Sequence, residues 1–215
     1  MKKISLDELR LLVADGCILQ DSINGPKVIR LNNGSCLKFF RLKTWFSSAL
    51  YFHYADKYIK NAQKLTALGI STTKIKDLYK IPKGYIKNSK LTKAVEYEFL
   101  PGQTVRDMIL EDNFDDEKVA QLAVFMAKLH NLGVYFRANH LANIVYNTEF
   151  PDKLGLIDVE NTLFYSKPLN CKERKHNLGQ MMRYEIDKNF ILKNKNLFIN
   201  NYAKWYNLAE LDSLI

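Results

Sequence analysis

The sequence has few cysteines, no long apolar run and no repeated or low-complexity segment. Its three cysteines, Cys17, Cys36 and Cys171, are far apart and odd in number, which excludes a disulfide framework and a C-x-x-C metal site and fits a reducing cytosol. No stretch reaches the roughly 18 apolar residues of a membrane-spanning helix. Acidic residues interrupt the apolar part of the N-terminal segment, so we do not expect a secretory signal. We expect a cytoplasmic protein.

The composition is that of a folded protein. Apolar residues make up 47% of the chain and charged residues 26%, a balance that provides for a packed core and disfavours disorder. A length of 215 residues suits one ordinary domain or two small lobes that share a cleft.

Positive charge is concentrated in the first half of the chain. Residues 1–95 contain 18 Lys and Arg against 6 Asp and Glu, whereas residues 96–215 contain 14 against 17. The densest stretch, 57–93, has ten lysines and a single acid. This pattern is typical either of a solvated lysine-rich surface or of a face that meets a polyanion, such as a phosphorylated glycolipid or a membrane surface. The excess of Lys over Arg, without a recognition motif, disfavours nucleic acid as the partner.

The first hundred residues predict an antiparallel sheet with one long helix. Residues 17–41 contain three runs rich in β-branched and aromatic side chains, separated by turn residues. The dipeptide Asn33-Gly34 predicts a two-residue hairpin, because both residue types tolerate a positive φ. Apolar spacing predicts a helix over 46–68. Met126 and the aromatic residues of the stretch from Trp45 to Tyr58 could contact lipid or pack in the core, and both interpretations stand.

The second half of the chain is mainly helical by pattern. A turn at Pro101-Gly102 predicts a hinge, and an apolar stripe over 117–132 predicts the clearest helix. Residues 172–210 also favour helix. We therefore predict an α+β, protein-kinase-like fold of two lobes: residues 1–100 with the antiparallel sheet, and residues 101–215 mainly helical.

Three features come in the order that a protein-kinase-like phosphotransferase requires. Lys38 lies mid-strand among apolar residues, as does the kinase lysine that pairs with nucleotide phosphates; a strand lysine that reaches water is the alternative. Asn143 falls five residues after Ala138, as the metal-binding Asn does in H-R-D-x-x-x-x-N. Asp158 closes an apolar strand fifteen residues later, where the Mg²⁺-binding Asp belongs.

These features give the chain a resemblance to a known family. It resembles the bacterial lipopolysaccharide-kinase-like group of the protein-kinase superfamily, the Kdo/heptose-kinase clan, and within it the branch labelled toluene-tolerance protein. The resemblance covers roughly residues 25–190 and is most specific over 127–158. Its blocks are Asn61 to Ile70, Ala127 to Arg137, His140 to Ile144, Leu154 to Asp158, and Lys172 to Asn177 with Arg183, Tyr184 and Asp187.

The resemblance implies an ATP- and Mg²⁺-dependent kinase of a sugar hydroxyl in the lipopolysaccharide inner core. It implies a cytoplasmic protein near the inner membrane, which the basic first lobe could contact peripherally. Lys38, Asn143 and Asp158 would bind the nucleotide, the last two through Mg²⁺. Arg137 takes the place of the catalytic-loop arginine. His140 stands where small-molecule kinases of the superfamily often carry histidine.

The chain also departs from the kinase pattern. Ala138 replaces the aspartate that would accept the substrate proton, and His140 is the nearest residue able to take that proton at neutral pH. The nucleotide loop, 20–27, has one glycine, and the helix predicted over 46–68 has no glutamate for Lys38. Three functions therefore remain open: a kinase with or without a histidine base, a pseudokinase that binds a nucleotide or a partner, and a basic protein that binds anions or RNA.

Overall fold

The computed structural model describes residues 1–23, 25–41, 54–82, 84–85 and 91–204. It divides into two compact units, one of residues 1–64 with 73–100 and the other of residues 65–72 with 101–215. Each unit is described by itself. In the described part of the chain, no helix is both long enough and apolar enough to cross a membrane.

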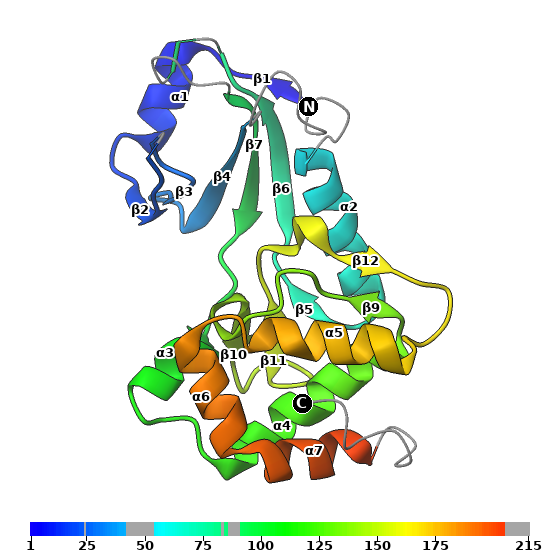
Figure 1. Cartoon of the computed structure of the whole chain (residues 1–215). Coiled ribbons are helices and arrows are strands. Elements are labelled where there is room, and N and C mark those ends of the chain that lie inside the picture. Colours follow the sequence, from blue (N-terminus) through cyan, green and yellow to red (C-terminus); the bar gives the residue numbers. More distant parts are fainter. Residues whose placement is uncertain (24, 42–53, 83, 86–90, 205–215) are drawn as a thin grey trace. The chain divides into compact units, whose positions relative to one another are not determined.

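The first unit is built on one sheet with helices on its faces (Figure 1). The strand order is β1-β6-β7-β4-β3-β2. All neighbours pair antiparallel except the edge strand β1, which runs parallel to β6, so the sheet is mixed at one edge rather than wholly antiparallel. The elements are β1 (Lys2–Lys3), α1 (Leu6–Val13), β2 (Cys17–Gln20), β3 (Val28–Arg30), β4 (Ser35–Arg41), α2 (Tyr54–Ala67), β6 (Ile75–Lys80) and β7 (Leu91–Glu98).

The β3–β4 connection is longer than the predicted two-residue hairpin. The Gly34 amide donates to the Leu31 carbonyl across 2.9 Å, and Ser35 N donates to Oδ1 of Asn33. Gly34 has a φ of 79°, whereas Asn33 is not among the residues with positive φ. The glycine therefore supplies the left-handed position alone, and the Asn33 side chain closes the turn.

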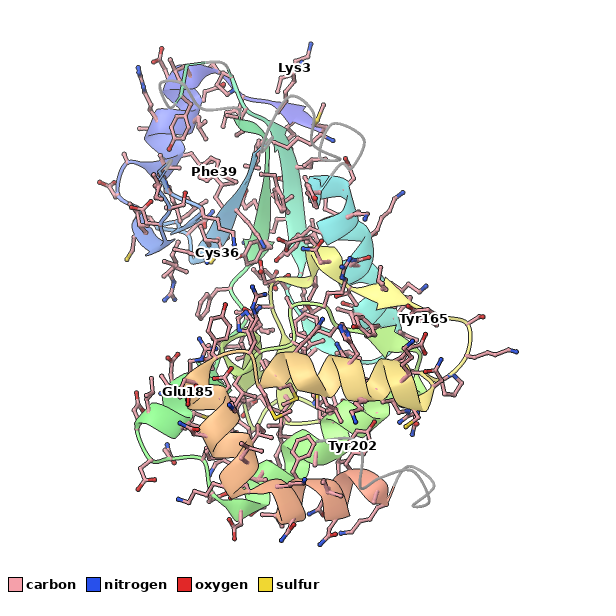
Figure 2. All side chains as sticks on the ribbon, viewed as in Figure 1. Lys3, Cys36, Phe39, Tyr165, Glu185 and Tyr202 are labelled. Atoms are coloured by element: carbon pink, nitrogen blue, oxygen red, sulfur yellow. The ribbon has the colours of Figure 1, made fainter. Side chains whose placement is uncertain are left out.

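Strand β4 buries both of its faces, because successive side chains point to opposite sides of a sheet. Leu37 and Phe39 join Leu9 of α1 in one buried cluster, and Phe39 is labelled in Figure 2. Phe40 instead contacts Tyr58 of α2, with ring centroids 5.8 Å apart. The strand is therefore enclosed by α1 on one side and by α2 on the other.

Helix α2 lies within the helix predicted over 46–68; residues 46–53 are outside the described part of the chain. The helix buries Ala55, Tyr58, Ala62 and Leu65, which recur at three- and four-residue spacing. Gly69 follows with a φ of 73°, the left-handed conformation that commonly ends a helix.

The second unit is mainly helical, with short strand pairs between the helices. The predicted helix over 117–132 is α4, and 205–210 of the predicted C-terminal helical region lies outside the described residues. The elements are β5 (Ser71–Thr72), β8 (Gln103–Thr104), α3 (Val105–Leu110), α4 (Asp116–Asn131), β9 (Val134–Tyr135), η2 (Leu141–Asn143), β10 (Ile144–Tyr146), β11 (Leu154–Leu156), η3 (Val159–Asn161), β12 (Leu163–Phe164), α5 (Cys171–Met181), α6 (Glu185–Lys193) and α7 (Lys195–Ala203).

The unit includes residues 65–72, which the sequence analysis assigned to the first lobe. Strand β5 pairs in parallel with β11, and Thr72 Oγ1 donates to the Leu156 carbonyl across 2.8 Å. This pairing, between positions more than 80 residues apart, has no local sequence signal.

Helix α4 forms the centre of the second unit. Its Leu122, Phe125, Met126 and Leu129 are fully or almost fully buried, and the helix packs along α7 (Figure 1). Met126 therefore belongs to the core and not to a lipid-contacting face. The predicted α+β, kinase-like fold is confirmed by the sheet-based first unit and the helical second unit.

Candidate active site

The loop between β9 and β10 carries most of the predicted site residues and is anchored by Asn177 of α5. The Asn177 side chain donates to the Phe136 carbonyl across 2.7 Å, and the backbone carbonyl of Asn177 accepts from Nδ2 of Asn139 across 2.8 Å. The ring of His130, on α4, contacts Oδ1 of Asn177 through Nε2 at 3.1 Å. Buried polar groups that are satisfied in this way fix a loop in one conformation.

The loop is also fixed from α6 by a buried carboxylate. Asp187 is fully buried, and its Oδ2 accepts from the Leu141 amide across 3.0 Å. Both carboxylate oxygens pair with Arg106 of α3 at 2.8 Å. The guanidinium of Arg106 in turn lies over the ring of Tyr184, 4.5 Å from its centroid. Asp187 thus joins the loop, α3 and α6 through charge-assisted hydrogen bonds.

Asn143 and Asp158 lie at the same end of the β10–β11 pair. The strands run antiparallel with Ile144 opposite Leu156, and the Ile157 amide donates to the Asn143 carbonyl across 3.0 Å. Asn143 therefore precedes one strand at the point where Asp158 has just left the other. Asp158 has φ 59° and ψ 43°, a left-handed conformation that is uncommon for a residue other than glycine and is often found at functional sites.

The side chain of Asn143 uses both of its amide hydrogens. Nδ2 donates to the Ala138 carbonyl across 3.0 Å and contacts Nε2 of His140 at 2.9 Å. The carbonyl acceptor fixes the amide's orientation, so Nε2 of His140 is the acceptor in the second bond and the neutral ring carries its proton on Nδ1. Oδ1 of Asn143 accepts no hydrogen bond from the described part of the chain.

The surroundings of His140 disfavour its charged form. Burial lowers the pKa of the imidazole, and the nearby Arg106 cation lowers it further. The ring of Tyr184 meets it edge-on, with centroids 5.2 Å apart. Nδ1 is buried and has no hydrogen-bond partner among the described residues.

A polar pocket of about 430 Å³ lies over this loop. Asp158, Ala138 and His140 line it, together with Arg137, Asn139, Asn161, Gln180, Arg183 and Tyr184. Asn139 is 1% exposed, and its buried Oδ1 has no partner among the described residues. An unpaired buried acceptor beside a polar pocket indicates that a water or ligand group completes the site.

Where the kinase pattern has a catalytic aspartate, this pocket has the methyl side chain of Ala138. Ala138 lines the pocket, and no carboxylate of the loop between β9 and β10 can replace it, because that loop has none. The neighbouring Arg137 is exposed and forms no ion pair within the described ranges.

Lys38 lies in the first unit, on the face of the sheet that α2 covers. It is 3% exposed, and its ammonium group lies 4.8 Å from the centroid of Tyr58. This burial excludes the alternative of a strand lysine that reaches water. The register places Val95 opposite Lys38, so the buried Glu96 points to the other face. A cleft that Lys38 shares with the second unit stays a prediction.

Two further features of the first unit concern places where the kinase pattern requires particular groups: an acid for the strand lysine and amides for the phosphates. Asp56, the one acid in the sequence of α2, forms an ion pair with Lys93 of β7 at 2.5 Å. In the loop between β2 and β3, the amides of Gly25 and Lys27 donate to the Ser22 and Gln20 carbonyls. Those amides are therefore already bonded within the loop.

The second unit offers oxygen ligands that fit Mg²⁺. The amide oxygen of Asn143 and the carboxylate of Asp158 are hard donors on residues at the same end of the β10–β11 pair, and Mg²⁺ is commonly held by one or two carboxylates together with substrate phosphates. No group of three or more His, Cys, Asp or Glu able to hold a metal occurs among the described residues. Asn143 and Asp158 by themselves suit an ion that substrate phosphates help to hold.

The residues that anchor the loop were missed as site residues by the sequence analysis. Asp187 and Asn177 appeared only within the blocks of the resemblance, and Arg106 did not appear at all. Their contacts join residues between 38 and 81 positions apart in the sequence, so no local sequence pattern could predict them.

Residues 100–202 match the sequence model of a family described as the lipopolysaccharide kinase (Kdo/WaaP) family. This match spans almost all of the described second unit. It supports a lipopolysaccharide-kinase-like family for the chain and a sugar-kinase-like phosphotransferase as its general type. No curated protein matches the chain.

Proposed function

We propose that the protein is an ATP- and Mg²⁺-dependent phosphotransferase that phosphorylates a sugar hydroxyl of the lipopolysaccharide inner core. The observation that carries this proposal is the placement of Asn143 and Asp158 at one end of the β10–β11 pair, beside a polar pocket, in the segment that matches the family. Mg²⁺ held there would neutralise charge on the transferred phosphoryl group.

Three side chains carry the proposed nucleotide roles. Asn143 contributes Oδ1 and Asp158 its carboxylate to the metal. Lys38 contributes a buried ammonium group for the phosphates. The hydrogen bonds from Asn143 to the Ala138 carbonyl and to His140 support this role, because they hold the amide with its oxygen free.

Transfer proceeds without a base on the protein: the sugar oxygen bonds to the γ-phosphorus, the bond to the ADP leaving group breaks, and the hydroxyl proton passes to water or to a phosphate oxygen. His140 could serve as the base only through Nε2, which accepts from Asn143, since Nδ1 carries the proton. Phosphoryl transfer depends mainly on positioning and electrostatic stabilisation, and the loss of general-base help lowers the rate without abolishing it. His140 then acts as a positioning residue, and Arg137 remains an exposed cation at the rim of the pocket.

A pseudokinase is the second candidate function. Ala138 favours it, because the pocket lacks the carboxylate that would accept the substrate proton. In that case the pocket would bind a nucleotide or a partner without turnover.

The cellular setting belongs to the same proposal. A cytoplasmic protein with peripheral contact at the inner membrane is supported by the excess of lysine in residues 1–95, since a basic residue near an anionic membrane surface contributes about 1 kcal/mol. Membership of the toluene-tolerance branch rests on the resemblance alone.

The test is transfer of label from γ-labelled ATP to core lipopolysaccharide, with the wild type, Asp158→Asn and Ala138→Asp. Transfer by the wild type that Asp158→Asn abolishes and Ala138→Asp raises by about 10² to 10⁴ supports the kinase. Nucleotide binding without transfer in the wild type overturns it and supports the pseudokinase.

A further inference from the structure

A second and larger cavity, of about 970 Å³, lies within the second unit and adjoins the polar pocket over the loop. The two share Arg137, Gln180 and Arg183 among their lining residues. Helix α5 provides one wall, and residues of β9 and β12 and their neighbours provide the rest. We call this cavity the α5 groove.

The α5 groove is strongly basic. Its cationic lining residues are Arg137, Lys172, Lys175 and Arg183. All four are exposed, and none of them forms an ion pair within the described part of the chain. The one acid in the lining, Glu173, accepts a hydrogen bond from the Asn170 amide at the start of α5.

This charge is local to the groove. Residues 96–215 contain fewer basic than acidic residues, so four cations beside one acid are not the background of this part of the chain. A concave surface lined by one sign of charge concentrates ligands of the opposite sign.

The face of α5 that lines the groove carries lysines and a glycine, and the glycine leaves space there. Lys172, Lys175, His176 and Gly179 recur at three- and four-residue spacing and so lie on one face of α5. A Cβ built on Gly179 would meet no atom within 4 Å. The glycine therefore lies beside open space between the lysines and the loop, although glycine inside a helix costs about 0.5–1 kcal/mol relative to alanine.

Aromatic side chains stand beside the cations. The rings of Tyr135 and His176 stack with an interplanar angle of 17° and are joined by a hydrogen bond between the Tyr135 hydroxyl and Nδ1 of His176. Tyr165, labelled in Figure 2, is 43% exposed and also lines the groove. Apolar rings with a few polar groups are typical of sites for small ligands.

We propose that the α5 groove is the acceptor subsite and that it binds an anionic substituent, a phosphate or a carboxylate, of the acceptor sugar. The assignment of the groove to the acceptor rests on the proposed function. The negative charge of the bound group is inferred from the groove's own residues. Lys172 and Lys175 pair with the anion, Tyr165 packs on the sugar, and Arg137 and Arg183 lead to the polar pocket where transfer takes place. An acceptor of net positive charge is excluded by the same charges.

The test measures binding of lipid-free core oligosaccharide by calorimetry, without nucleotide. The double variant Lys172→Glu with Lys175→Glu should weaken binding at least tenfold. Its control, Lys188→Glu with Lys193→Glu, makes the same charge change on exposed positions of α6 and should leave binding within twofold. Equal losses in the two double variants would overturn the proposal, because they would show attraction to net charge alone.

A steric variant tests the same groove independently of charge. Gly179→Phe should weaken binding at least tenfold by filling the open space, whereas Gly179→Ala should bind normally and melt at a temperature no lower than the wild type. Normal binding by Gly179→Phe would overturn the proposal. Melting curves of all variants establish that they are folded.

Modified oligosaccharides identify the source of the negative charge. Loss of binding after phosphatase treatment assigns a phosphate, and loss after carboxyl reduction assigns a carboxylate. Retained binding after both treatments overturns the proposal. Oligosaccharide binding at the groove without phosphoryl transfer would contradict the proposed function alone, and transfer with an unchanged KM in the Lys172/Lys175 double variant would contradict the groove alone.

Discussion

Asn143 donates a hydrogen bond to Nε2 of His140 across 2.9 Å, and the same amide nitrogen donates to the Ala138 carbonyl. The pair joins the residue that stands in the place of a metal-binding Asn to the histidine nearest the missing base. It turns the amide oxygen of Asn143 away from both partners, and it uses the lone pair that His140 would need as a base. One hydrogen bond thus supports both the metal site and transfer without a base.

Substitution of His140 separates positioning from base catalysis. His140→Gln keeps an acceptor for Asn143 and should bind Mg²⁺·ATP within about twofold of the wild type. His140→Ala should bind about tenfold more weakly, because partners that orient metal ligands typically contribute 10- to 100-fold to affinity. Calorimetric titration measures both values.

The pH dependence of turnover provides the control for that pair of variants. If His140 only positions Asn143, His140→Gln keeps both the rate and the shape of the pH profile. A large loss of rate in His140→Gln with normal nucleotide affinity would instead identify the histidine as the base.

His130 should make the protein less stable in mild acid. Burial lowers the pKa of this imidazole from 6.5 to about 4, and the ring is held by the Tyr202 hydroxyl and by Asn177; Tyr202 is labelled in Figure 2. Because the folded-state pKa lies below the unfolded one, stability is fully present above pH 6.5 and falls as the pH approaches 4. The loss should be about 3 kcal/mol.

Urea unfolding at several pH values measures this loss. His130→Gln is the control, since glutamine cannot titrate, and the difference between the two stability curves isolates the histidine from the carboxylates. A difference that stays constant between pH 7 and pH 4 would contradict the burial of a neutral His130.

Asp187 should be essential for the stability of the loop. Asp187→Ala leaves Arg106 without its bidentate partner and the Leu141 amide without its acceptor, so the free energy of unfolding should fall by about 3 kcal/mol. Glu98→Ala, which removes an exposed ion pair with Lys74, should change it by less than about 1 kcal/mol. If chemical denaturation gives similar losses in the free energy of unfolding for the two variants, the buried pair stabilises the protein no more than the exposed pair does.

The elements with a strong local pattern could be predicted from the sequence. The apolar stripe of α4 and the glycine after it follow directly from side-chain spacing, and so do the antiparallel strands β2, β3 and β4. Helix α1 was missed although a signal exists: Ser5 and Glu8 form a capping box. The parallel edge strand β1 has only two residues and no pattern that could reveal it.

The sequence could predict that the two motif residues lie near each other, but not which residues anchor the loop beside them. Asn143 and Asp158 follow from spacing along one chain segment, and they lie at the same end of one strand pair. The burial of Asp187 depends on Arg106, 81 residues away, and the basic groove depends on α5 facing β9 and β12. Charge counts along the sequence placed the basic surface in the first half of the chain. They missed the basic groove of the second half, because its acidic residues outnumber its basic ones in the sequence.

The most direct measurement is the Mg²⁺-dependent affinity for ATP of the wild type and of Asp158→Asn. Asparagine tolerates the left-handed backbone of Asp158, so this variant removes a charge without adding strain, and its melting temperature should stay within about 2 °C of the wild type. We expect the wild type to bind ATP only with Mg²⁺, and Asp158→Asn to bind at least tenfold more weakly. Equal affinities in the two proteins, or binding that does not depend on Mg²⁺, would contradict a metal–nucleotide site at Asn143 and Asp158.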